Sequence, residues 1–178
     1  AIAWWKRAAA QGHSRALFYL GTCHDFGHGM AKSVAKAMGY YRQAAIRGHV
    51  TAQYNLALGY RDGDGAARAP GRAAQGFQRA AKQNDPDALR DLGVCYYEGL
   101  GTRRNWPAVA RCYQKAARLG DAKALCNLGY CYRDGVGVPR NPAKAEDCFR
   151  RASAAGNPTA RAILERGIQG GARPRPKV

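Results

Sequence analysis

ALCNLGYCYRDGVG, residues 124–137, reads as one helix that ends in a tight glycine turn. Its pattern recurs along the chain at a fixed interval of 36 residues. The alanine that opens it recurs as Ala16, Ala52, Ala88, Ala124 and Ala160. The leucine four residues later recurs as Leu20, Leu56, Leu92, Leu128 and Leu164. A repeat of this length indicates a solenoid, in which each repeat is one supersecondary unit.

The remainder of this helix and its turn repeat in the same register. The residue after the leucine is small in the first four copies, as Gly21, Ala57, Gly93 and Gly129. An aromatic column follows as His24, Tyr60, Tyr96 and Tyr132. Two glycine columns close the unit, as Gly27, Gly63, Gly99, Gly135 and Gly171 and as Gly29, Gly65, Gly101 and Gly137. We call these predicted elements the LG helices, after the leucine and the small residue.

A second helix is predicted before each LG helix, and we call these the aromatic helices. Their aromatic column is Trp5, Tyr41, Phe77, Tyr113 and Phe149. Paired small residues follow three and four positions later, as Ala8-Ala9, Ala44-Ala45, Ala80-Ala81, Ala116-Ala117 and Ala152-Ser153. This spacing places the ring and the small residues on one helical face.

Capping residues predict where these helices begin and end. Gly12, Gly48, Gly120 and Gly156, with Asn84 in the third copy, are residues that tolerate the left-handed C-terminal cap. Ser33, Asn105, Asn141, Asp85, Asp121 and Asn157 are N-cap types, and Pro70 and Pro142 suit a first helical turn. The predicted helix pairs are 1–12/13–28, 33–48/49–63, 69–84/85–99, 105–120/121–135 and 141–156/157–168.

The pattern A-x-x-x-L-G-x-x-Y-x-x-G-x-G, followed by an aromatic and an Ala-Ala-x-x-Gly segment, resembles the Sel-1-like repeat family. That family consists of α/α solenoid modules related to tetratricopeptide repeats, and the resemblance covers residues 1–168. The departures are Ala57 for glycine, His24 for tyrosine, Gly76 where the neighbouring repeat has Tyr40, and a degenerate last copy at Glu165 and Ile168.

We therefore predict an all-α fold, a right-handed α/α solenoid of five helix-pair repeats with a 36-residue period. The predicted repeat array covers residues 1–168, with repeats at about 1–32, 33–68, 69–104, 105–140 and 141–168. Residues 169–178 are predicted to form a basic, flexible tail.

The charge balance is strongly basic, with 29 Lys and Arg against 12 Asp and Glu, or a net charge of +17. Several of these charges flank the aromatic column on outward faces, at Lys6, Arg7, Arg42, Arg79, Lys115, Arg150 and Arg151. Such a field favours acidic protein partners or RNA, while a merely solvated basic face is the alternative. The sequence contains no run of 18 apolar residues, so no membrane span is predicted.

The start of the chain is apolar, with Ala1, Ile2, Trp4 and Trp5. Ser33 is the predicted N-cap of the equivalent helix one repeat later. Judged against it, position 1 falls about one turn inside the first helix, which suggests that the chain is a fragment, is a processed product or lacks a flexible start. An apolar end on a solenoid predicts further repeats or a neighbouring subunit there. The composition favours a mitochondrial matrix or cytosolic setting over the periplasm.

The six cysteines fall into the columns Cys23/Cys95/Cys131 and Cys112/Cys148, with Cys126 alone. Column mates lie one or more repeats apart, beyond the reach of a disulfide, although a bridge across columns such as Cys95 to Cys112 stays open. A cysteine-rich branch of the resembled family joins its helices through cysteines eight residues apart, and this chain lacks that spacing. We expect buried thiols without disulfides, as in a reducing compartment.

No catalytic, cofactor or metal site is predicted. Cys23, His24 and His28 cluster in the sequence, but His24 occupies the aromatic column and His28 the glycine turn. Residues 62–65, DGDG, look like part of a calcium loop but lack its closing glutamate. No nucleophile elbow, phosphate loop or dinucleotide-binding motif is present.

The resemblance to tetratricopeptide arrays implies that the LG helices line a concave, partner-binding face. The positions that it assigns to partner contact are Arg15, Phe18, Tyr54, Asn55, Arg61, Arg90, Tyr97, Asn127, Tyr130 and Arg133. The competing interpretation is that several of these positions serve only to stack the repeats. The predicted function is a non-catalytic protein–protein interaction scaffold, as a subunit of or adaptor in a larger complex. The alternative is an RNA-associated component of a ribonucleoprotein assembly.

Overall fold

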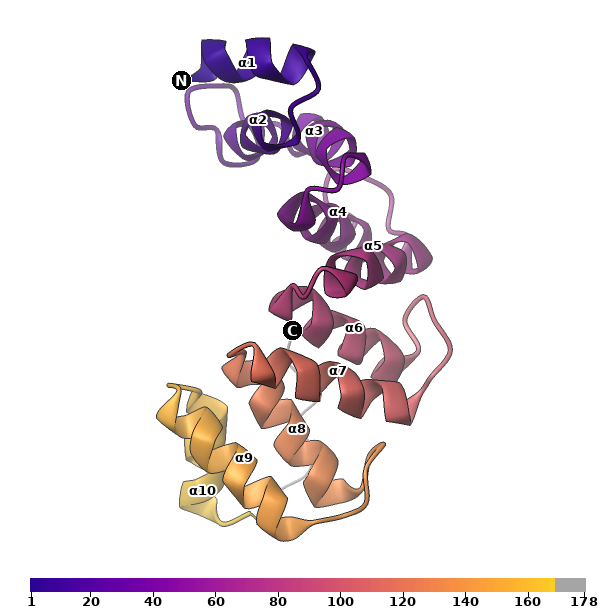
Figure 1. The fold of residues 1–178 in the computed structure, drawn as a ribbon, viewed down its shortest axis with the longest axis vertical. Coiled ribbons are helices and arrows are strands. Elements are labelled where there is room, and N and C mark those ends of the chain that lie inside the picture. The colour runs from indigo at the N-terminus through magenta and orange to yellow at the C-terminus, as the bar shows by residue number, and fades with distance from the viewer. Residues whose placement is uncertain (169–178) are drawn as a thin grey trace. The chain divides into compact units, whose positions relative to one another are not determined.

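A computed structural model describes residues 1–168, and every helix or strand found within them is an α-helix (Figure 1). The predicted tail at residues 169–178, which includes Gly171, lies outside the described residues. The helices of the described part are α1 (Ile2–Ala10), α2 (Ser14–Phe26), α3 (Val34–Ile46), α4 (Val50–Asp62), α5 (Pro70–Lys82), α6 (Pro86–Glu98), α7 (Trp106–Arg118), α8 (Ala122–Asp134), α9 (Pro142–Ala154) and α10 (Pro158–Arg166). The all-α prediction is therefore confirmed, and each predicted helix is present with slightly shorter ends.

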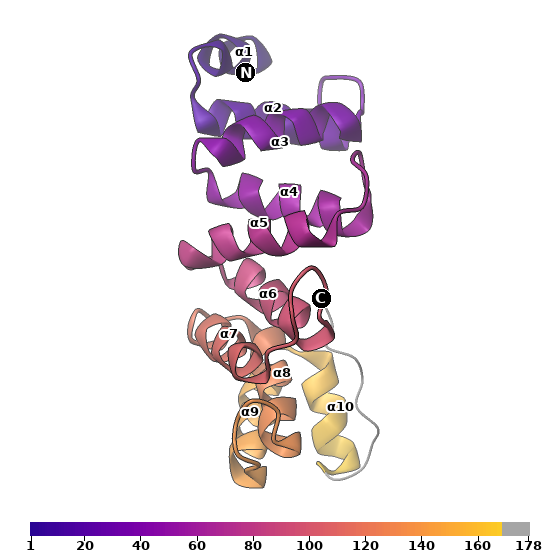
Figure 2. The same cartoon turned by 90° about the vertical axis from the view of Figure 1, so that its right-hand side faces the viewer.

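The described residues form two compact units, of which the first is Ala1–Gln83 and the second begins at Asn84. The first unit contains α1 to α5, and Figure 2 shows its helices α2 to α5 as successive layers. The second unit contains α6 to α10. Within each unit, the most extensive packing joins an LG helix to the aromatic helix that follows it, as in α2 with α3 and α8 with α9.

The helices begin where the capping residues predict. The Asp121 carboxylate accepts a hydrogen bond from the Ala124 N–H at 2.8 Å, which satisfies one of the unpaired donors at the start of α8. The same type of cap is made by Ser33, Asp85, Asn105, Asn141 and Asn157. At the start of α4, a histidine replaces these residues, and His49 Nδ1 accepts the hydrogen bond from Ala52 N–H at 3.3 Å.

The aromatic helices also end as predicted. Asn84 takes the place of the capping glycine and has a φ of 64°, and within the described residues no other non-glycine residue has a positive φ. Asparagine tolerates this left-handed conformation better than most residues, which explains why it substitutes for glycine in the third copy.

The core of each unit is built from the aromatic column and the small residues around it. Tyr41 and Phe77 are buried in the first unit, and Tyr113 and Phe149 in the second. The glycine of the LG pair is needed because the ring lies directly over it: a Cβ atom at Gly129 would lie 2.6 Å from Cε1 of Phe149. The Leu-Gly dipeptide is thus a packing requirement in the pairs α2–α3, α6–α7 and α8–α9, where Gly21, Gly93 and Gly129 each lie under a ring.

Candidate interaction surfaces

The predicted partner-binding residues of the first unit lie on α2 and α4. Arg15 is exposed, and Phe18 is half-buried. The Phe18 ring stacks on the His49 imidazole with a centroid distance of 4.5 Å and an interplanar angle of 16°. Burial and the nearby Arg15 charge both lower the pKa of His49. This end of the two helices therefore presents a fixed aromatic pair beside an exposed guanidinium.

Three further predicted residues lie along α4. Tyr54 is half-buried, with its ring centroid 5.7 Å from that of Phe77. Asn55 lies beside the side chain of Tyr41, whose hydroxyl donates a hydrogen bond to Asp25 Oδ2 at 3.0 Å. Arg61 is half-buried and pairs with the adjacent Asp62 at 2.8 Å. All three are held by neighbouring groups while keeping part of their surface accessible.

In the second unit, Tyr130 and Arg133 form a pair on α8. The guanidinium carbon of Arg133 lies 4.8 Å from the ring centroid of Tyr130, within the range of a cation–π contact. Arg133 also binds Asp134 at 2.8 Å, and the Tyr130 ring meets Phe149 edge-on at 5.3 Å. Burial raises the pKa of Tyr130 to about 12, so its hydroxyl stays a neutral hydrogen-bonding group.

Tyr97 is the remaining half-buried residue of the predicted set in the second unit. Its ring packs edge-on against Trp106, with 5.4 Å between the centroids. Trp106 is itself partly exposed at the start of α7. The two rings join the end of α6 to the beginning of the next helix.

Two members of the predicted set are buried inside the second unit. Arg90 is 5% exposed, and its guanidinium contacts Asp87, Asp91 and Asp121. It therefore ties α6 to the residue that caps α8. Asn127 is 6% exposed, and within the described residues its Nδ2 has no hydrogen-bond partner. Neither side chain is presented at the surface of its unit.

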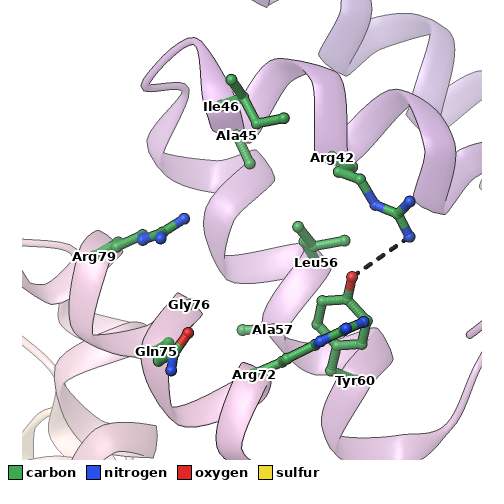
Figure 3. A pocket seen from close by; sticks show the side chains of 10 residues that line it. All are labelled: Arg42, Ala45, Ile46, Leu56, Ala57, Tyr60, Arg72, Gln75, Gly76 and Arg79. Atoms are coloured by element: carbon green, nitrogen blue, oxygen red, sulfur yellow. Dashed lines mark hydrogen bonds between the residues drawn. The ribbon is translucent and has the colours of Figure 1, made fainter. Parts of the chain in front are cut away.

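A pocket that the sequence reasoning did not identify opens in the first unit between α3, α4 and α5 (Figure 3). Its volume is about 230 Å³. The lining residues are Arg42, Ala45, Ile46, Leu56, Ala57, Tyr60, Arg72, Gln75, Gly76 and Arg79. Two features noted in the sequence belong to this pocket and could have indicated it. They are the outward-facing arginines Arg42 and Arg79 and the presence of Gly76 where the neighbouring repeat has an aromatic residue.

The groups that suggested metal or thiol chemistry are used in packing. His24 Nδ1 lies 3.1 Å from the Ala31 carbonyl oxygen, and its ring stacks on Tyr40. All six cysteines are buried, and burial raises the pKa of Cys112 and of Cys148 to about 11. Within residues 1–168, no three His, Cys, Asp or Glu side chains are gathered as a metal site would require.

None of the described helices is long and apolar enough to cross a lipid bilayer.

Solved structures that resemble this chain include repeat proteins. A protective antigen of uropathogenic Escherichia coli with an SLR fold is 32% identical over 91% of this chain, with a TM-score of 0.88. A Sel1 repeat protein from Oxalobacter formigenes is 31% identical over 88% of this chain, with a TM-score of 0.83. The chain spans 35% of the length of the former and 64% of the latter.

Helicobacter pylori cysteine rich protein B is a more distant structural relative. It is 27% identical over 74% of this chain and 98% of its own, with a TM-score of 0.58. The comparison with curated proteins gave no match.

The Sel1 repeat family model matches residues 1–13, 14–49, 50–85, 86–121 and 122–157. Each full match begins at the first residue of an LG helix and continues through the following aromatic helix, the pair that packs most extensively. Sel1 repeats generally mediate protein–protein interaction and are in general a non-catalytic scaffold. On its sequence pattern, its packing and these matches, the chain belongs to the Sel1 repeat family.

Proposed function

We propose that this protein is a non-catalytic interaction scaffold, a subunit of or adaptor in a larger complex, that binds partner proteins through its LG helices. The observation that carries the proposal is the set of half-buried aromatic rings on those helices, Phe18, Tyr54, Tyr97 and Tyr130. Each ring packs against another aromatic ring, so it loses little conformational freedom on binding. Held aromatic side chains with accessible surface are the typical anchors of protein interfaces.

Arginines accompany the rings in both units. Arg15 lies near the Phe18–His49 pair, and Arg133 lies over Tyr130. Arginine and tyrosine are, with tryptophan, the residues most enriched among the side chains that dominate binding at the centres of protein interfaces. Because Arg90 and Asn127 are buried, the proposed contact set is reduced to Arg15, Phe18, Tyr54, Asn55, Arg61, Tyr97, Tyr130 and Arg133.

The test is capture of partners by the tagged protein from its own source, with and without ribonuclease and at two salt concentrations. We expect a defined set of proteins that survives ribonuclease and is lost with Tyr54→Ser or Tyr130→Ser. Arg111→Ser, an exposed change on α7, is the control and should keep the set. Circular dichroism verifies that each variant is folded. A captured set that is indifferent to both tyrosine variants would contradict binding through the LG helices.

The same experiment addresses the RNA-associated alternative, which the net charge of +17 supports. RNA binding through phosphates weakens steeply as salt rises, because bound counterions are released. Associated material that disappears with ribonuclease and with moderate salt would favour a ribonucleoprotein component over the protein scaffold.

A further inference from the structure

We propose that the pocket between α3, α4 and α5 binds an acidic segment of a partner protein, with a carboxylate at the arginines and an apolar side chain on the floor. This inference rests on the proposed scaffold function, and it adds a second contact surface with a defined partner chemistry. Because the pocket lies wholly within the first unit, its geometry does not depend on the second unit.

Three arginines surround the opening. Arg42 comes from α3, and Arg72 and Arg79 come from α5 (Figure 3). Arg42 and Arg79 approach from opposite sides of the hollow, with Leu56 and Ala57 between them. None of the residues that line the pocket is Asp or Glu, so the lining itself provides no carboxylate to neutralise these guanidinium groups.

The arginines are held in place by an aromatic ring. Arg42 Nη2 donates a hydrogen bond to the Tyr60 hydroxyl at 3.4 Å, and Arg72 lies over the Tyr60 ring with 5.6 Å to the centroid. These contacts position two guanidinium groups, and because Tyr60 is neutral they leave the positive charge of both groups unneutralised. Arg79 is exposed, and within residues 1–168 it makes no hydrogen bond or ion pair. A carboxylate is the group that a guanidinium binds with the best geometry.

The floor of the pocket is apolar. Ala45, Leu56 and Ala57 provide it, and Ile46 stands at the rim with 73% of its surface exposed. An exposed isoleucine beside unneutralised arginines suits a ligand that carries both an apolar and an acidic side chain. RNA is disfavoured, because the only lining ring, Tyr60, is buried and covered by Arg72, which leaves no face for a base to stack on.

The second unit has the corresponding positions two repeats later, and there the arginine is neutralised within the chain. Asp147 takes the place of Gln75, and Arg151 takes the place of Arg79. These two residues form an ion pair at 3.3 Å. Cys148 stands at the position of Gly76, so a side chain is present where the first unit has none. The chain itself therefore shows how this arginine is neutralised when it is not available for a partner.

This contrast supplies the decisive variant. Gln75→Asp places a carboxylate four residues before Arg79, the same arrangement as Asp147 and Arg151. Gln75 is exposed, so the change should leave the fold intact. Gln78→Asp is the matched control, because Gln78 is exposed on the same helix but does not line the pocket. Both variants lower the net charge equally and differ only in where the charge stands.

The probe is a displayed library of random-sequence peptides, selected on the immobilised whole protein at physiological salt. We expect enriched peptides that carry Asp or Glu next to a large apolar residue. In fluorescence anisotropy, Gln75→Asp and Arg79→Gln should weaken these peptides about tenfold or more, and Gln78→Asp should change little. Replacing the acidic residues of the peptide by their amides should have the same effect as the pocket variants.

Enriched peptides without acidic residues, peptides indifferent to Gln75→Asp, or no enrichment at all would overturn the proposal. A single-stranded RNA oligonucleotide that binds and is weakened by the same variants would reassign the pocket to RNA. The proposal for the pocket and the proposal for the LG helices can be contradicted separately. Tyr54→Ser and Tyr130→Ser test the proposed function without changing any residue that lines the pocket.

Discussion

Gly76 on α5 packs directly against Ala57 on α4: a Cβ atom at Gly76 would lie 2.7 Å from the Cβ atom of Ala57. In the LG helices α2, α6 and α8 the position of Ala57 is Gly21, Gly93 and Gly129, and in every other aromatic helix the position of Gly76 has a side chain. Ala57 and Gly76, which both depart from the repeat pattern, therefore compensate for each other. The methyl group of Ala57 on α4 occupies the space that a side chain at position 76 on α5 would need.

Gly76→Ala should destabilise the first unit by roughly 1–3 kcal/mol, because the added methyl meets a helix-anchored Cβ that cannot turn away. Gly39→Ala is the matched control on α3, where a Cβ meets no atom within 4 Å. That change should instead stabilise the helix by about 0.5–1 kcal/mol, since alanine has the higher helix propensity. Urea unfolding followed by circular dichroism measures both changes.

The double variant Ala57→Gly/Gly76→Ala tests whether the two positions are coupled. Removing the methyl at position 57 makes room for the one at position 76, so the double variant should lose less stability than the two single changes together. Strictly additive effects would show that the α4–α5 contact is not the reason for the exchange.

The local features of the fold could be predicted from the sequence because their causes are local. An N-cap needs only a short polar side chain near its own helix, as at Asp121, and a left-handed C-cap needs only glycine or asparagine, as at Asn84. The 36-residue spacing then places like residues in like environments. Fold class and helix positions follow from these two kinds of information.

The pocket and the depth of individual side chains depend on contacts between helices far apart in the sequence. Helical periodicity places Arg90 on a face of α6, but its burial arises because Asp121, 31 residues later, reaches back to it. Likewise Arg42 and Arg79 are each outward-facing in the sequence pattern, and only the packing of α3, α4 and α5 brings them to one hollow.

Arg90→Met should destabilise the second unit by roughly 3–5 kcal/mol. The change removes the cation that pairs with Asp91, which is 2% exposed, and so breaks an ion pair of a buried carboxylate. Arg111→Met, an exposed change on α7, should stay within about 0.5 kcal/mol of the original protein. Denaturant unfolding measures both, and equal stability of the two variants would contradict a structural role for the ion cluster.

Acidification should weaken the first unit through His49. Its Nδ1 accepts the capping hydrogen bond from Ala52 N–H, which only the neutral ring can do. Because the folded-state pKa is lowered, the unfolded chain binds the proton more readily. The contribution is therefore complete above about pH 6.5, the ordinary histidine pKa, and is lost as the pH falls through the lower folded value. The loss should be about 1 kcal/mol, the usual worth of a cap.

His49→Asn tests this assignment, because asparagine caps α10 at the corresponding position and does not titrate. Thermal unfolding across pH 5 to 8 should show a smaller decline toward acid in the variant than in the original protein. Parallel pH profiles for the two proteins would show that another group is responsible for the acid sensitivity.

The thiols should be protected from alkylation in the folded protein. Burial raises the pKa of Cys112 and Cys148 to about 11, so at pH 8 only about one in a thousand of either is the reactive thiolate. Because all six thiols are buried, iodoacetamide followed by intact-mass analysis should add almost no label to the native chain. In denaturant, all six cysteines should be labelled without prior reduction. Fewer than six labels on the denatured chain would reveal a disulfide. Rapid labelling of the native chain would show that these helix pairs open far more often than their packing implies.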